Sequence, residues 1–155
     1  MRLHVLAAAV AAALPAHGTV VPGKSLGGVR LGDSSERVVA LWGRRFGVCK
    51  DCRRRTWYYT YARYQPQGAG VEFRRNRVVG LFTLWSPTGW QTSRGLRIGD
   101  PAAKVTSLYG PLTKVGCGTY DAYLLPNGRT LTAFYVFNEQ VWGFGVSLQA
   151  VPACR

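Results

Sequence analysis

The sequence contains few of the residues that most often carry out catalysis or bind metal ions. Only two histidines and one methionine occur among its 155 residues, and all three lie within the first 18 positions: Met1, His4 and His17. From position 19 onward, the absence of histidine excludes Ser-His-Asp and Cys-His catalysis, histidine-bound zinc and an imidazole general base. We therefore expect a protein that is not an enzyme, with no cofactor and no metal site.

Long apolar runs are also missing. The stretch from Val5 to Leu14 has ten apolar residues, whereas a helix that spans a membrane needs about 20. A positively charged start precedes this stretch, Pro15 ends it, and Ala16 and Gly18 stand at the −3 and −1 places of a cleavage site. This order predicts a secretory signal peptide over residues 1–18. The remaining chain, about 137 residues, has the size of one compact domain, which we expect to be secreted and monomeric.

Acidic residues are scarce. The chain has 20 Lys and Arg against 7 Asp and Glu, a formal net charge of +13, or +12 after removal of the signal. The excess is uneven, with 13 cations against 4 acids over residues 19–85 and 6 against 3 over residues 86–155. A basic excess favours an anionic partner such as a cell-envelope polymer, an acidic lipid surface, a nucleic acid or an acidic protein, although it also serves solubility.

One pattern occurs twice. Residues 28–43 have the sequence GVRLGDSSERVVALWG, and residues 95–110 have the sequence GLRIGDPAAKVTSLYG, with seven identities at an offset of 67. We interpret this as a tandem repeat, with repeat one over residues 19–86 and repeat two over residues 87–155, the two together forming one globular unit.

Each copy carries the signals of a short amphipathic helix. Asp33 and Asp100 are the expected N-caps, and Pro101 takes the first helical position of the second copy. Apolar residues follow at the i, i+3, i+4 spacing of one helix face. Gly43 and Gly110 are expected to end the two helices.

After each helix the period of the pattern changes from 3.6 to 2, which predicts strands. In the first copy the expected strands are 57–61, 71–74 and 78–85, with Arg75-Asn76 as a two-residue hairpin loop. In the second copy they are 120–124, 130–137 and 141–148, with a turn at 126–128 and a loop at Asn138-Glu139. The fold class is therefore α+β: each repeat is a short helix followed by an antiparallel meander of three to four strands, with both helices packed on one face of the sheet.

The hairpin register assigns residues to faces. Phe73 is expected to face Val78, which puts Gly80 and Phe82 on the helix-covered face together with Gly143 of the second copy. The opposite face is then open. It is basic in repeat one, where Arg74 and Arg77 lie beside Glu72, and aromatic in repeat two, where Tyr135 and Trp142 lie. The alternative is that a loop covers Tyr135 and Trp142.

The repeated helix and meander resemble the secreted β-lactamase-inhibitor proteins of actinobacteria, and the single unit is similar to small envelope lipoproteins of the SmpA/OmlA type. The resemblance covers residues 28–154 and implies a binding scaffold whose two meanders share one sheet. The inhibitors carry an acidic residue on a hairpin loop that mimics part of the substrate, whereas Arg75-Asn76 has no carboxylate. The resemblance therefore implies binding and not β-lactamase inhibition.

Four cysteines, Cys49, Cys52, Cys117 and Cys154, are expected to form disulfides in an exported chain. Three pairings are possible, and we favour Cys49–Cys52 with Cys117–Cys154, because each pair then stays within one repeat. The spacing of Cys49 and Cys52 also permits an alternative function, that of a small exported thiol–disulfide redox protein.

The function favoured by the sequence is that of a secreted, non-enzymatic binding module. Its partner is a protein or an anionic polymer at the cell surface, with no specific nucleic acid and no transmembrane segment. A structural envelope protein without a discrete ligand is a further alternative. The candidate binding residues are Arg53, Arg54, Arg55, Arg74, Arg77, Trp85, Tyr135 and Trp142.

Overall fold

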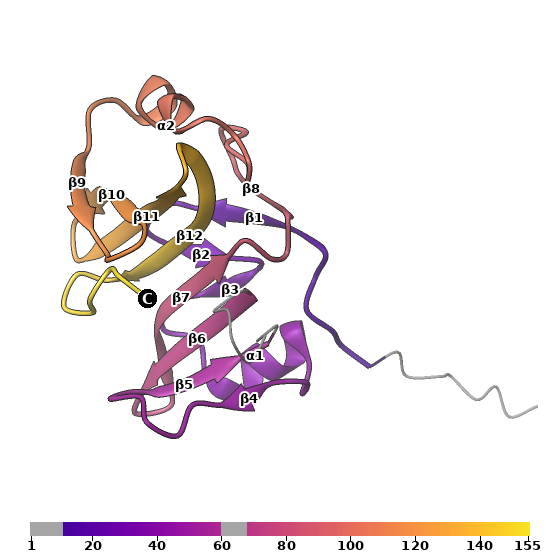
Figure 1. Ribbon diagram of the computed structural model, residues 1–155. Coiled ribbons are helices and arrows are strands. Elements are labelled where there is room, and N and C mark those ends of the chain that lie inside the picture. The colour runs from indigo at the N-terminus through magenta and orange to yellow at the C-terminus, as the bar shows by residue number, and fades with distance from the viewer. Residues whose placement is uncertain (1–10, 60–67) are drawn as a thin grey trace, which may run out of the picture.

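The computed structural model describes residues 11–59 and 68–155, which form an α+β fold with two helices and two sheets of mostly antiparallel strands (Figure 1). The helices are α1 (Ser35–Trp42) and α2 (Ala102–Tyr109). The strands are β1 (His17–Val21), β2 (Ser25–Leu26), β3 (Val29–Arg30), β4 (Gly47–Val48), β5 (Arg55–Tyr58), β6 (Gly68–Arg74), β7 (Arg77–Leu84), β8 (Gly89–Thr92), β9 (Thr113–Gly116), β10 (Asp121–Asn127), β11 (Thr130–Phe137) and β12 (Gln140–Leu148).

The larger sheet has eight strands in the order β4-β5-β6-β7-β12-β11-β10-β9. Both meanders contribute to it, and they meet where β7 pairs antiparallel with β12. The smaller sheet, which the sequence did not predict, has the order β3-β2-β1-β8, with β1 and β8 parallel. Its first strand includes His17 and Gly18, which lie within the predicted signal segment. Neither helix among the described residues is long and apolar enough to cross a membrane.

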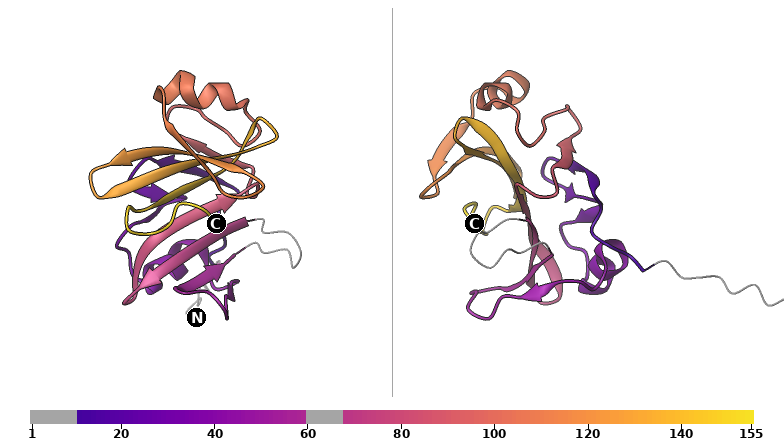
Figure 2. Two further views of the ribbon diagram at one scale, coloured as in Figure 1. Left: turned by 60° about the vertical axis from the view of Figure 1, so that its left-hand side comes forward. Right: turned by 45° about the vertical axis from the view of Figure 1, so that its right-hand side comes forward.

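One face of the large sheet carries the main core. The smaller sheet and α1 lie on the same side of it (Figure 2). Trp42 of α1, Trp90 of β8 and Val105 of α2 are fully buried in one cluster with Phe134 and Phe144 of the large sheet. Burying large apolar side chains on a single face is the dominant stabilising contribution in such a layered fold.

The helix ends correct two of the predicted caps. The N-cap of α1 is Ser34, whose hydroxyl accepts from the Arg37 N–H, and the residue before α2 is Pro101, which has no side-chain cap bond. Asp33 and Asp100 instead accept from the backbone N–H three residues earlier, at 2.9 and 2.8 Å, and so close the turn that leads into each helix. The first N–H of α2 is satisfied by the Glu139 carbonyl at 2.9 Å, so this helix start needs no side-chain cap.

The hairpin loops were predicted correctly. Arg75-Asn76 and Asn138-Glu139 form two-residue loops in which all four residues have positive φ, between 49° and 59°. This is the twist that a tight hairpin requires. The turn expected at 126–128 is displaced, because Asn127 still pairs with Thr130 and the loop is Gly128-Arg129. The end of the predicted 57–61 strand lies outside the described residues.

A bulge in each central hairpin changes the predicted faces. Phe73 faces Val78 as expected, but Glu72 pairs with Gly80 because the register shifts between Glu72 and Phe73. The extra residue reverses the alternation, so Gly80 and Phe82 lie on the face away from the helices. An equivalent shift between Tyr135 and Val136 places Gly143 there too, opposite Tyr135.

Each half of the chain makes the same pair of backbone hydrogen bonds just before its helix. The Gly32 N–H donates to the Val78 backbone carbonyl at 2.8 Å, and the Val78 N–H donates to the Asp33 backbone carbonyl at 2.8 Å. In the second half, Val141 exchanges the same pair of bonds, both at 2.7 Å, with Gly99 and Asp100. Each repeated Gly-Asp turn is therefore joined to the strand that follows the hairpin loop.

Candidate functional site

The main charged surface lies where two neighbouring loops of the large sheet meet. The β4–β5 loop and the β6–β7 loop are adjacent because Arg55 pairs with Phe73 next to Arg74. Together, residues 49–56 and 72–78 contain seven Arg and Lys against two acids. Six of these cations are exposed, and we call them the basic end: Lys50, Arg53, Arg55, Arg74, Arg75 and Arg77.

Aromatic packing supports the basic end from below. The Arg55 guanidinium lies 4.9 Å from the ring centres of both Trp57 and Phe73, within the range of a cation–π contact. Trp57 in turn stacks on Phe46 at 3.8 Å. These contacts hold the guanidinium of Arg55 over the two rings, although the residue remains exposed.

The loop of the β6–β7 hairpin is tied to the start of α1. The Ser35 hydroxyl donates to the Asn76 side-chain oxygen at 2.5 Å, and the Asn76 amide donates to Glu36 at 3.2 Å. The pKa of Glu36 is lowered by a hydrogen bond from its own backbone N–H and by the Asn76 amide. The loop that presents Arg74, Arg75 and Arg77 is thus fixed at its tip.

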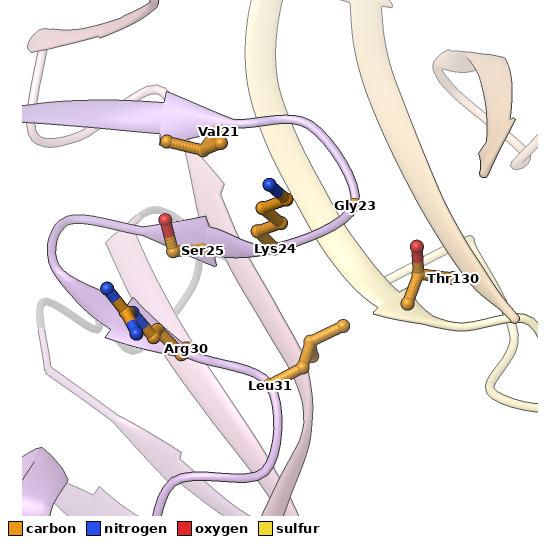
Figure 3. Close-up of a pocket in the computed structure, with 7 residues that line it drawn as sticks. All are labelled: Val21, Gly23, Lys24, Ser25, Arg30, Leu31 and Thr130. Atoms are coloured by element: carbon orange, nitrogen blue, oxygen red, sulfur yellow. The ribbon is translucent and has the colours of Figure 1, made fainter. Parts of the chain in front are cut away.

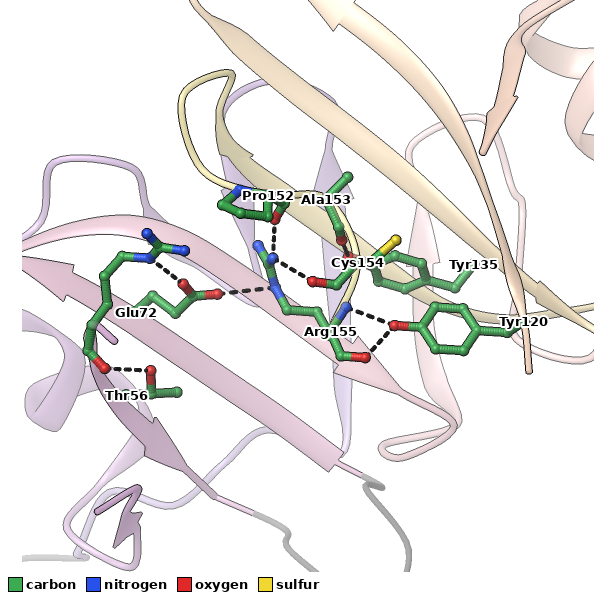
Figure 4. A network of polar contacts seen from close by, with 9 residues as sticks. Thr56, Glu72, Tyr120, Tyr135, Pro152, Ala153, Cys154 and Arg155 are labelled. Carbon is green, nitrogen blue, oxygen red and sulfur yellow. Dashed lines mark hydrogen bonds and ion pairs between the residues drawn. The ribbon is translucent and has the colours of Figure 1, made fainter. Parts of the chain in front are cut away.

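A buried carboxylate lies beside the basic end (Figure 4). The Glu72 side chain is 9% exposed, and its Oε2 accepts from Nε of Arg54 at 2.7 Å. Its Oε1 lies 3.0 Å from Nε of Arg155. Glu72 was expected on an open face. The C-terminal segment covers it instead.

That segment also covers Tyr135, which corrects one predicted binding residue. Tyr135 is fully buried, its hydroxyl donates to the Ala153 carbonyl at 2.5 Å, and Tyr120 exchanges hydrogen bonds with the backbone of Arg155. Burial raises the pKa of both tyrosine hydroxyls. The sequence left a covering loop open as an alternative, and residues 149–155 supply it.

Both favoured disulfides are present. Cys49 is joined to Cys52, and Cys117 to Cys154, and no free cysteine occurs in the chain. The first pair closes the β4–β5 loop, while the second fastens the C-terminal segment to the β9–β10 loop just after the end of β9. Disulfides are typical of exported proteins, which agrees with the predicted secretion. Among residues 11–59 and 68–155, no three His, Cys, Asp or Glu side chains are grouped so that they could hold a metal ion.

A second surface is aromatic. Trp85 and Phe137 are 39% and 41% exposed, and together with the half-buried Trp142 they line a cleft of about 280 Å³. Trp85 has φ 63°, a left-handed conformation that is rare for a bulky residue and that tends to occur at functional sites.

The structure separates the predicted basic and aromatic residues. Arg77 begins β7 and Trp85 follows its last residue, so the two lie about 26 Å apart along the strand at about 3.3 Å per residue. The single basic and aromatic face that the sequence predicted is therefore two surfaces at opposite ends of the central strands.

A third cleft, of about 480 Å³, lies between the smaller sheet and the β10–β11 turn (Figure 3). Lys24 and Arg30 from the small sheet line it together with Thr130, and the side chains of both cations are exposed. This cleft is cationic but lacks the clustering of the basic end.

Sequence reasoning missed Lys50 and Arg75 of the basic end, Phe137 of the aromatic cleft and Arg155 beside Glu72. Arg75 was treated only as a loop residue. Phe137 was not among the candidate binding residues, although Trp142, which lines the same cleft, was. Arg155 was not considered. The charge run from Arg74 to Arg77 was a usable signal for Arg75. No sequence signal connects Arg155 with Glu72, because the two are 83 positions apart.

No protein-family model matches the chain, and no curated protein matches it. Among solved structures, an extracellular protein with an SCP domain from Bacillus anthracis is similar at 14% identity and a TM-score of 0.56, over 77% of this chain and 44% of that one. A DUF4309 family protein, YjgB of Bacillus subtilis, is similar at 13% identity and a TM-score of 0.53, over 82% and 88%.

A cysteine-rich secretory protein from Staphylococcus aureus is similar at 13% identity and a TM-score of 0.53, over 90% of this chain and 51% of that one. The chain thus spans about half or less of the two proteins that are described as extracellular or secretory. Likeness at this level of identity shows the fold alone.

Proposed function

We propose that the protein is a secreted, non-enzymatic binding module whose basic end engages an anionic polymer of the cell envelope. The observation that carries this proposal is the gathering of six exposed cations on two adjacent loops and the strand ends that flank them. Glu72, which lies in β6 and is one of the two acids of residues 49–56 and 72–78, is withdrawn from the surface by its pairing with Arg54 and Arg155. The electrostatic potential at the surface of the basic end is therefore strongly positive.

Such a surface binds a polyanion mainly by releasing the counter-ions condensed on the polymer. Affinity then falls steeply with salt, with a slope set by the number of anionic groups contacted. The hydrogen bonds between Asn76 and α1 and the aromatic rings beneath Arg55 hold the loops in one arrangement before binding. Fixed cations lose less conformational entropy on binding than free ones do.

Export of the module is supported by the two disulfides and by neighbours described as extracellular or secretory. We also propose that residues 19–86 and 87–155 are tandem repeats. The matching bulges and the matching bonds of Val78 and Val141 support this arrangement.

Binding to inorganic polyphosphate tests the proposal, with neutral dextran as the uncharged comparison. The variant R53Q/R55Q/R74Q/R75Q removes four cations from the basic end. The matched control K24Q/R30Q/R94Q/R129Q removes four exposed cations elsewhere. We expect the first variant to lose affinity by more than about tenfold, and its salt slope to flatten by about 0.7–0.9 for each phosphate that it no longer neutralises. Equal losses in both variants, or no binding by the wild type at about 50 mM salt, would refute the proposal.

A second candidate function is recognition of a protein at the aromatic cleft. It is favoured by the exposure of Trp85 and Phe137 beside Trp142, because aromatic residues dominate the binding energy of protein interfaces. Capture from secreted proteins with wild type and with W85A tests it. A partner that is retained at high salt by the wild type alone supports this function, and equal capture by both excludes it.

A further inference from the structure

A pocket of about 250 Å³ lies between two segments that different disulfides hold in place. Cys52 belongs to the pair that closes the β4–β5 loop, and Cys154 belongs to the pair that fastens the C-terminal segment. Both half-cystines line the pocket. Its two walls are thus anchored covalently, one from each half of the chain.

The side chains that line this pocket carry an excess of positive charge. Arg53, Arg54 and Arg155 contribute three guanidinium groups, and Glu72 contributes one carboxylate. Each oxygen of Glu72 faces the Nε of a different arginine, at 2.7 Å for Arg54 and 3.0 Å for Arg155. One carboxylate neutralises one cation, so these side chains leave a net charge of about +2, which favours an anion in the pocket.

The Arg155 guanidinium is rigid and incompletely satisfied. Its side chain is 7% exposed, and Nη1 donates to the carbonyls of Pro152 and Cys154. Its Nε lies close to Glu72, but the N–H is not aligned for a hydrogen bond. The pair is therefore held by charge, and the buried N–H that lacks a hydrogen bond is the Nε–Hε that faces Glu72.

Glu72 fixes the positions of both arginines through its two ion pairs. It occupies the Nε atom of Arg54 and leaves the outer nitrogens of that guanidinium, whose side chain is 31% exposed, beside the pocket. Figure 4 shows the Glu72 carboxylate facing the Arg155 guanidinium, and the other oxygen of Glu72 faces Nε of Arg54. Two guanidinium groups fixed in this way form a preorganised donor site for an oxyanion, because the planar fork of arginine matches the oxygens of a phosphate.

We infer that this pocket binds a single phosphate group of the anionic polymer, an inference that rests on the proposed function and deepens it. The exposed cations of the basic end attract the polymer at long range, and the pocket takes one of its phosphodiester groups. A water molecule takes up about 30 Å³, so the cavity has room for a phosphate and several waters. A pocket of this kind requires a polymer that carries phosphate groups and not only carboxylate groups.

The test follows the Nε–Hε signals of Arg54 and Arg155 by NMR in the full-length, oxidised protein. It is titrated with dimethyl phosphate, as a phosphodiester probe, and with inorganic phosphate, both at constant ionic strength. We expect saturable shifts of both signals with either probe and smaller shifts with acetate. R54Q should weaken phosphodiester binding at least about tenfold, R54K should weaken it less, and R129Q, on the distant β10–β11 turn, should leave it unchanged.

The same samples are tested with polyphosphate, so that the two proposals fail separately. If polyphosphate binds but both arginine signals stay unchanged in every titration, the pocket inference is wrong and the proposed function stands. If inorganic phosphate binds but dimethyl phosphate does not, the pocket holds a free anion and the polymer assignment is wrong. If R54Q does not fold, R53Q, an exposed change on the same wall, carries the comparison.

Discussion

The backbone N–H of Trp85 donates to the carbonyl of Trp142 at 2.5 Å, across the seam where the two halves of the large sheet meet. This bond holds Trp85 in its left-handed conformation just beyond the last residue of β7. Both indoles line the same cleft. A strained backbone and an exposed aromatic ring thus occur at one position.

The strain at Trp85 predicts an unusual order of stability. Both W85G and W85A remove the ring, but only glycine adopts φ 63° without a steric penalty. We expect W85G to be more stable than W85A by about 1 kcal/mol. Urea unfolding measures the difference. Equal stability would mean that the backbone relaxes once the ring is gone.

Two glycines at matching places in the sheet should respond differently to alanine. A Cβ on Gly143 would collide with the Thr83 carbonyl, whereas a Cβ on Gly80 would meet only side-chain atoms, at 3.3 Å or more. We expect Gly143→Ala to destabilise the fold by at least about 2 kcal/mol and Gly80→Ala by less than about 1 kcal/mol. Thermal unfolding of the two variants decides it, and similar losses would contradict the observed pairing of β7 with β12.

Tyr59 predicts a loss of stability at alkaline pH. Burial raises the pKa of its hydroxyl to about 12, from about 10 in the unfolded chain, and the hydroxyl donates to the Gly43 carbonyl at 3.0 Å. Because the folded state holds this proton more tightly, its contribution is complete below pH 10 and is lost as the pH rises through about 12. Y59F should flatten the decline in unfolding free energy over this range. An unchanged pH profile in Y59F would show that other groups cause it.

Asp100 predicts a loss of stability in acid. Burial by itself would raise the pKa of Asp100, but hydrogen bonds from Lys104 and from the Arg97 N–H outweigh it and lower the pKa. Its contribution is present above the unfolded pKa and is lost as the pH falls through the lower folded value. D100N should reduce this loss between about pH 5 and 2, whereas D51N, which also removes one negative charge, should not. Equal effects would assign the acid response to net charge.

The disulfide between Cys117 and Cys154 should account for much of the stability of the C-terminal segment, residues 149–155. It joins residues 37 positions apart, so the chain-entropy model gives about 3–4 kcal/mol. The double variant C117S/C154S is expected to lose that amount in urea unfolding. It should also speed hydrogen exchange at the backbone N–H of Arg155, which is bonded to Tyr120. A loss below about 1 kcal/mol would mean that the tyrosine hydrogen bonds hold the segment alone.

The local elements followed from the sequence because each depends on neighbours in the chain. The apolar spacing around Val38, the glycines that end both helices and the loop pairs Arg75-Asn76 and Asn138-Glu139 are short-range signals, and the structure confirms them. Asp33 and Asp100 were assigned the wrong role, since the same carboxylate can close a turn or cap a helix. The role that each carboxylate takes depends on where the neighbouring hairpin contacts the start of the helix.

The sequence by itself determined the helices, the two central hairpin loops and the charge excess, and among three possible cysteine pairings it favoured the one that forms. Only the tertiary structure decided the faces of the sheet, because one bulged residue reverses the alternation of every residue beyond it. It also decided that the C-terminal segment covers Tyr135 and brings Arg155 to Glu72. That contact joins positions 83 residues apart, and a pairing at such a distance depends on how the whole chain packs, which no local pattern records.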